Sequence, residues 1–261
     1  MIDIKNLEKI FKDSFKKSPV FFKKDIIIPA LHYLYGDYTI NNFKQFPGSY
    51  IENGILYEYN SDGHRCDEFT KVHDGKHVLF AGCSETFGVS STAETTWPYF
   101  LHQKINEKEK TSGFFRLGYP GGGFQLILKG VMNYINLYGK PDELFILFPH
   151  LERRVEFDDN VFKNIVHAPL NSPKEIDDRY RYSIEEYAMW IFEMKERMIT
   201  FEEYCSSNNI KLYWSFFMNG ISSICENISE FINYVSMQDD YNMHKWIYEK
   251  YSEEELKIKD I

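Results

Sequence analysis

The sequence has few cysteines, and this limits the chemistry that it can carry. The four are Cys66, Cys83, Cys205 and Cys225, and no two of them form a C-x-x-C pair. Structural zinc sites and thioredoxin-like redox sites use such pairs, so neither kind of site is supported. We predict a protein that needs no metal or other cofactor, in a reducing setting.

The sequence also lacks long apolar runs and an excess of basic residues. No run is long enough to span a bilayer, and residues 1–6 contain no apolar signal-peptide core. The expected location is therefore the cytoplasm. Lysine and arginine number 30 against 39 aspartates and glutamates, a formal net charge of -9. Nucleic acid is not expected as the partner, because binding its phosphates needs a concentrated basic face.

The apolar content that is present indicates a globular protein. Hydrophobic residues make up 43% of the 261 residues, enough for a sizeable core. Residues 1–59 are interpreted as an N-terminal extension. Apolar residues at helical spacing predict an amphipathic helix over 3–17, with irregular or short-strand structure after it. Residues 60–261 would form the main domain.

From residue 77 onward, strand-like and helix-like segments alternate. The predicted strands cover 77–82, 114–117, 143–148 and 211–217, and the predicted helices cover about 96–107, 124–138 and 183–207. This alternation predicts a three-layer α/β sandwich around a mostly parallel, flavodoxin-like sheet of about five strands. Residues 151–182 are polar and poorly periodic, which predicts a lid or insertion over the carboxyl edge of the sheet.

The end of the first predicted strand carries the candidate nucleophile. An apolar run stops at Gly82 and is followed by Cys83, Ser84 and a polar segment suited to a helix start. Enzymes of the α/β class expose a serine hydroxyl at such a strand–turn–helix junction. A plain strand–loop–helix connection explains Gly82 equally well. Cys83 would point to the opposite side from Ser84, so it is expected to be a buried small residue.

Other predicted strand ends bring groups that a nucleophilic serine requires. In a parallel sheet these ends meet at one edge, where ligands bind. The loop Gly118–Gly123 offers backbone N–H groups for an oxyanion, and the segment Asp239–His244 places a carboxylate near an imidazole. A serine needs a histidine to take its proton, and the histidine needs an acid to fix its tautomer.

In order and spacing, these elements resemble the SGNH (GDSL-type) hydrolases, in particular a divergent branch found in phage and bacterial genomes. The resemblance covers about residues 60–245. The motifs that carry it are Asn60-x-x-Gly63-x-Arg65, Gly82-Cys83-Ser84-Glu85-Thr86-Phe87-Gly88, Thr96-Trp97-Pro98, Leu117-Gly118-x-x-Gly121 and Asp240…His244.

The resemblance implies a serine esterase with a catalytic triad and an oxyanion hole. Ser84 would be the nucleophile, and its own backbone N–H would be one oxyanion donor. Gly121 would supply the second N–H, with Gly118 as the alternative. His244 would be the base and Asp240 its acid partner. Asp239 is an alternative acid, because the segment is one residue longer than the family's D-x-x-H.

The segment after the third predicted strand departs from the family pattern. The family has an oxyanion-donating asparagine where this chain has Phe148-Pro149-His150-Leu151-Glu152-Arg153. His150 is a further candidate oxyanion donor, and Arg153 is a candidate for substrate binding. Arg65 is another such candidate, although it could instead tie its turn to the domain.

The expected reaction is hydrolysis of an O-acyl ester, most simply an O-acetyl ester, in a small molecule or glycan. The carbohydrate part follows from the resemblance alone. Two alternatives stay open. One is acyl transfer at the same site, and the other is a catalytically inactive glycan-binding or structural module.

Overall fold

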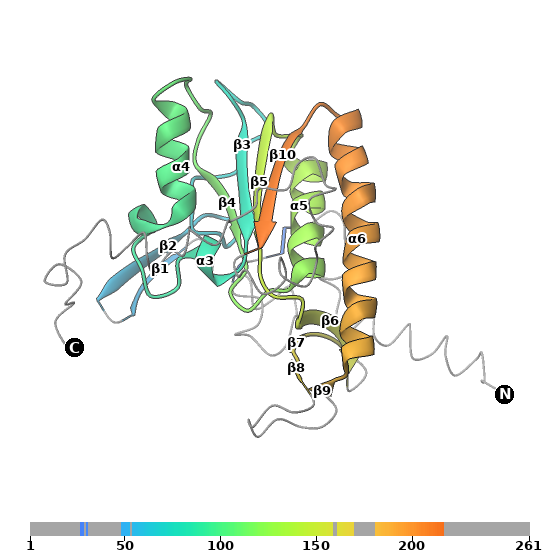
Figure 1. The fold of residues 1–261 in the computed structure, drawn as a ribbon. Coiled ribbons are helices and arrows are strands. Elements are labelled where there is room, and N and C mark those ends of the chain that lie inside the picture. Colours follow the sequence, from blue (N-terminus) through green and yellow to red (C-terminus); the bar gives the residue numbers. More distant parts are fainter. Residues whose placement is uncertain are drawn as a thin grey trace, which may run out of the picture.

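The computed structural model describes residues 27, 28, 30, 48–52, 54–158, 161–169 and 181–216. The predicted helix over 3–17 lies outside these residues. At the centre of the described part is a parallel sheet of four strands, flanked by helices (Figure 1). Within the described residues, no helix combines the length and the apolar character that a membrane span needs.

The strand order of the sheet is β10-β5-β3-β4, and every neighbouring pair is parallel. These strands are β3 (Val78–Gly82), β4 (Phe115–Gly118), β5 (Glu143–Phe148) and β10 (Lys211–Phe216). Among these four strands, the first in chain order, β3, therefore lies between the second, β4, and the third, β5. Its last residue, Gly82, pairs in register with Gly118 on one side and Leu147 on the other.

Helices cover both faces of this sheet. Helix α4 (Trp97–Asn106) lies on one face, and α5 (Phe124–Tyr138) and α6 (Ile184–Ser207) lie on the other (Figure 1). The side chains of β3 alternate accordingly. Val78 and Phe80 join the apolar cluster with α4, whereas Leu79 and Ala81 join the cluster with α5 and α6. The arrangement is consistent with the predicted three-layer sandwich.

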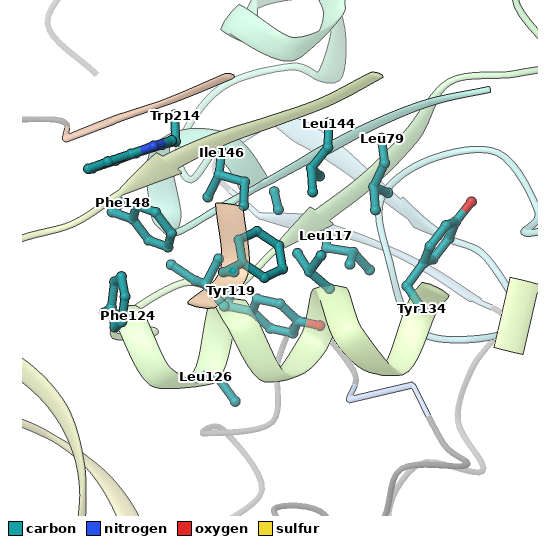
Figure 2. Packing of buried hydrophobic residues seen from close by; sticks show 14 of the residues in the cluster. Leu79, Leu117, Tyr119, Phe124, Leu126, Tyr134, Leu144, Ile146, Phe148 and Trp214 are labelled. Carbon is teal, nitrogen blue, oxygen red and sulfur yellow. The ribbon is translucent and has the colours of Figure 1, made fainter. Parts of the chain in front are cut away.

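The larger core lies between the sheet and α5. Figure 2 shows Leu79, Leu117, Leu144 and Ile146 of the strands above this helix, and all four are buried. Within α5 a glycine, Gly130, allows close packing, because a Cβ there would collide with the hydroxyl of the buried Tyr119. Burial of this apolar area stabilises the fold, at roughly 25 cal/mol per Å².

Local patterns predicted the regular elements closely. Strand β5 and helix α5 have the predicted bounds, and the other strands of the sheet and helices α4 and α6 differ from prediction by a residue or so at their ends. The start of α6 has a capping box: Ser183 Oγ accepts a hydrogen bond from Glu186 N (3.2 Å), and Glu186 Oε2 accepts one from Ser183 N (2.7 Å).

Two regions contain strands whose bounds were not predicted from the sequence. Residues between β5 and α6 form an antiparallel pair and a short parallel pair beyond the carboxyl ends of the sheet (Figure 1). The bounds are β6 (Arg153–Asp158), β7 (Val161–Val166), β8 (Ala168–Pro169) and β9 (Arg181–Tyr182). Upstream, β1 (Gly48–Glu52) and β2 (Ile55–Tyr59) form an antiparallel hairpin.

A buried histidine at the amino end of β3 makes stability depend on pH. His77 Nδ1 donates to the carbonyl oxygen of Lys140 (3.1 Å), and His77 Nε2 accepts from the hydroxyl of Tyr134 (2.8 Å). Burial, followed by the nearby His73, lowers the pKa of His77 to about 4. Both hydrogen bonds suit the neutral ring, so the folded state resists its protonation.

We predict that unfolding becomes easier as the pH falls from about 6.5 to about 4. The unfolded chain binds a proton at His77 near pH 6.5, whereas the folded chain does so only near pH 4. The expected loss in the free energy of unfolding is about 2–3 kcal/mol. Urea titrations across this range should show a weaker pH dependence for His77→Gln. If the free energy of unfolding changed equally with pH in the wild type and in His77→Gln, the pH dependence would not come from His77.

Candidate active site

The order of the strands reverses at one point of the described sheet. In open parallel sheets, ligands bind beyond the carboxyl ends of the strands where the strand order reverses. Here this point lies between β3 and β5, since the chain runs from β3 to β4 on one side and then to β5 on the other. Ser84 follows the end of β3 and His150 follows the end of β5. Two predicted site residues therefore leave the sheet from neighbouring strands.

Ser84 is the first residue of the short helix α3 (Ser84–Phe87) and is half-buried. Cys83, the N-cap residue, is buried in the core cluster with α5 and α6. Ser84 Oγ lies 3.9 Å from Cys83 Sγ. The expectation that Cys83 is a buried core residue is confirmed, and Ser84 is the more accessible of the two potential nucleophiles.

Gly82 allows α3 to begin directly after β3. A Cβ at this position would lie 2.6 Å from the carbonyl oxygen of Leu147 and would collide with the hydroxyl of Thr86. The Thr86 hydroxyl also accepts a hydrogen bond from Trp97 Nε1 (3.2 Å). The turn that carries Ser84 is therefore held against both the neighbouring strand and the start of α4.

The glycine-rich loop after β4 packs against this turn. Tyr119 N donates a hydrogen bond to Gly82 O (2.9 Å). A Cβ at Gly118 would lie 2.5 Å from Phe87 Cα, and one at Gly123 would collide with the carbonyl oxygen of Arg153. The loop thus touches the turn of Ser84 at one end and the start of β6 at the other.

The two predicted oxyanion donors differ in their surroundings. Gly118 is enclosed by the backbone of Phe87. Gly121 has φ of +71°, a left-handed conformation that favours glycine, and among the described residues beyond its chain neighbours no heavy atom lies within 4 Å of a Cβ built on it. Gly121 is thus less closely packed by the described residues than Gly118, which favours it as a group that meets a ligand.

The Arg65 side chain makes contacts within the fold. It is 4% exposed, and its guanidinium donates to the carbonyl oxygens of Gly88 and Ser91 (2.8 Å each) and Leu56 (3.0 Å). Its Cζ also lies 4.2 Å from the ring centre of Tyr57. Arg65 therefore ties the turn after α3 to β2, the alternative that the sequence left open.

A second buried arginine, Arg116 of β4, supports Arg65 and was not identified from the sequence. Its Nε and Nη2 both donate to the carbonyl oxygen of Arg65, and its Nη1 donates to Thr96 Oγ1 (2.9 Å). Burial lowers the pKa of Arg116 to about 10, so it stays charged at neutral pH. A lone arginine within the apolar run from Phe114 to Leu117 is the signal that indicates such a buried guanidinium.

The segment after β5 carries His150, Glu152 and Arg153. The His150 side chain is 34% exposed, and its Nδ1 lies 3.9 Å from Glu152 Oε2. Arg153 N donates to His150 O (3.2 Å). The Arg153 side chain is half-buried, and its Nη1 has no hydrogen-bond partner among the described residues. Glu152, two residues after His150, was not singled out from the sequence.

The predicted base and acid, His244 and Asp240, lie outside the described residues, as does the alternative acid Asp239. Three other histidines bond within the fold, as expected for structural residues. His64 Nε2 bonds the carbonyl oxygen of Ile28 (2.9 Å), His102 Nε2 bonds Thr111 Oγ1 (2.8 Å), and His77 has the partners given above.

Comparison with known proteins names no family, since no protein-family model matches the chain and no curated protein matches its sequence. Across the described ranges, no group of three or more histidine, cysteine or acidic side chains could hold a metal ion. A groove of about 690 Å³ lies between α5 and α6, and Ser84 is not among its lining residues. The observations that bear on function therefore concern three chain segments: the turn that carries Ser84, the glycine-rich loop after β4 and the segment after β5.

We predict that Arg65→Met destabilises the fold by about 3 kcal/mol, because buried carbonyl groups lose charged hydrogen-bond donors. Arg197→Met, at an exposed position on α6, is the matched control and should change stability by less than about 0.5 kcal/mol. Chemical denaturation measures both. If Arg65→Met kept full stability, the hydrogen bonds of the guanidinium to these carbonyl groups would not stabilise the fold.

Proposed function

We propose that this protein is a serine esterase of the SGNH type that hydrolyses an O-acyl ester, with an O-acetyl group on a carbohydrate as the preferred substrate class. One observation carries the proposal. Ser84 begins a helix directly after β3, at the point where the strand order reverses. The order β4-β3-β5-β10 also corresponds to the first four strands of the flavodoxin-like order 2-1-3-4-5.

In the proposed reaction, Ser84 Oγ attacks the acyl carbon and forms a tetrahedral intermediate. The backbone N–H of Ser84 belongs to the first turn of α3, where helix geometry provides no intrahelical acceptor. This N–H and that of Gly121 would hold the oxyanion. Removal of one such donor typically slows the reaction about 10²–10³-fold.

His244 would take the proton from Ser84 Oγ and return it to the leaving alcohol oxygen as the ester bond breaks. A water molecule, deprotonated by the same imidazole, would then attack the acyl-enzyme. That step releases the carboxylic acid and restores the serine hydroxyl. Asp240, or Asp239 in its place, would orient His244 and stabilise the imidazolium. These roles come from the resemblance.

The proposed substrate contacts lie after β5. Arg153 is retained as a candidate because its partly buried guanidinium has an Nη1 atom without a hydrogen-bond partner in the described part of the chain. The carbohydrate preference rests on analogy with the family. A second candidate function, an inactive glycan-binding module, is favoured by the histidine that stands where the family has its oxyanion-donating asparagine.

We predict that the purified protein reacts with a fluorophosphonate probe and hydrolyses p-nitrophenyl acetate, and that Ser84→Ala abolishes both reactions. Cys83→Ala is the matched control: it sits next to the nucleophile but in the core, so labelling should persist. Labelling is read by mass spectrometry of the modified peptide. A folded wild-type protein that is neither labelled nor active would support the inactive module instead.

We also predict that Asp240→Asn lowers kcat on p-nitrophenyl acetate by about 10³–10⁴-fold, because the histidine loses the acid that fixes its tautomer. Asp239→Asn is the matched substitution one residue away and should change kcat by less than about 10-fold. Steady-state kinetics at pH 7 compares the two variants. The opposite ranking would assign the acid role to Asp239.

A further inference from the structure

His150 and Glu152 bring an imidazole and a carboxylate close together after β5, at the edge of the sheet where Ser84 follows β3. In register, Leu147 of β5 pairs with Gly82 of β3, so the chain leaves both strands side by side. Ser84 is two residues beyond that pair on β3, and His150 is three residues beyond it on β5. His150 thus follows the strand that neighbours the one leading to Ser84, and its side chain is 34% exposed.

The two carboxylate oxygens of Glu152 differ in their partners. Its Oε1 accepts a hydrogen bond from the hydroxyl of Tyr182 (3.1 Å). Burial, together with the charge of Glu152, raises the pKa of Tyr182, so the phenol stays a donor at neutral pH. Glu152 Oε2 is buried, lacks a hydrogen-bond partner among the described residues, and lies 3.9 Å from His150 Nδ1.

Glu152 Oε2 lies on the Nδ1 side of the His150 ring, at 3.9 Å from Nδ1, which is longer than a hydrogen bond. A carboxylate next to Nδ1 favours the form that carries its hydrogen on Nδ1. The neutral ring then has its lone pair on Nε2, across the ring from Glu152. In that form Nε2 is a hydrogen-bond acceptor.

The Tyr182 side of this arrangement is rigid. Tyr182 stacks on Tyr187 with ring centres 5.3 Å apart, and its ring centre lies 5.0 Å from that of Trp190. Both partners belong to the start of α6, whose capping box begins at Ser183. The phenol that anchors Glu152 is therefore fixed by a helix of the main fold.

From this geometry we infer that His150 is a specificity-determining residue. Its Nε2 accepts a hydrogen bond from a free hydroxyl on the alcohol part of the ester, and Glu152 and Tyr182 are its positioning residues. The substrate class is then the ester of a polyhydroxylated alcohol with a hydroxyl next to the acylated one. The inference rests on the proposed esterase activity and names the alcohol that it recognises.

The test uses the full chain and two acetate esters. Glycerol monoacetate has a neighbouring hydroxyl, and propyl acetate lacks it. We expect wild-type protein to prefer glycerol monoacetate by about 10-fold in kcat/KM, the usual effect of one hydrogen bond. His150→Phe keeps a ring of similar size and should remove that preference. Glu152→Gln should reduce the preference, and His73→Phe, at the opposite end of the sheet, should leave it unchanged.

The ratio of two kcat/KM values does not depend on the fraction of active enzyme, so partial misfolding of a variant does not hide the result. No preference in the wild type, or an unchanged preference in His150→Phe, would overturn the inference. So would a loss of p-nitrophenyl acetate hydrolysis in His150→Phe above about 100-fold, since His150 would then act on the reacting ester group as an oxyanion donor or in proton transfer and not on a neighbouring hydroxyl. Absence of any Ser84-dependent turnover would be a different result, because it would remove the proposed function itself.

Discussion

The close backbone approach at Gly82 is the constraint on which the candidate site depends. This residue ends β3 between Gly118 and Leu147, and any side chain on it would collide with the Leu147 carbonyl or the Thr86 hydroxyl. Helix α3 can start only two residues after the strand ends because Gly82 carries no side chain. Ser84 owes its place at the edge of the sheet to that short connection.

Close contacts at glycines also join the loop after β4 to this turn and to the start of β6. Gly118 packs against the backbone of Phe87, and Gly123 packs against the carbonyl of Arg153. Two buried arginines then support the assembly through backbone carbonyls: Arg116 holds the carbonyl of Arg65, and the Arg65 side chain holds the turn that follows α3. Buried guanidinium groups are tolerated where their N–H groups have acceptors.

The chemistry proposed for the edge follows from what these contacts leave accessible. Cys83 is packed into the core, whereas Ser84 is not. Gly121, in the loop after β4, has a left-handed backbone conformation, and His150 follows β5 with Glu152 beside it. Ser84, Gly121 and His150 thus follow the carboxyl ends of three neighbouring strands, β3, β4 and β5, and the proposed acyl chemistry assigns each of them a role. The parts not yet placed are His244 and its acid, which stay predictions.

The sequence by itself determined the alternating elements of the sheet, the turn at Gly82 and the choice of Ser84 over Cys83. Each depends on periodicity or on neighbours in the chain, so local signals suffice. Only the tertiary structure decided the role of Arg65, the buried position of Arg116 and the pairing of Glu152 with Tyr182. Their partners lie 9 to 51 residues away in the chain. Contacts of that kind leave no spacing pattern in the sequence, because they form only when separate strands and loops meet at one edge.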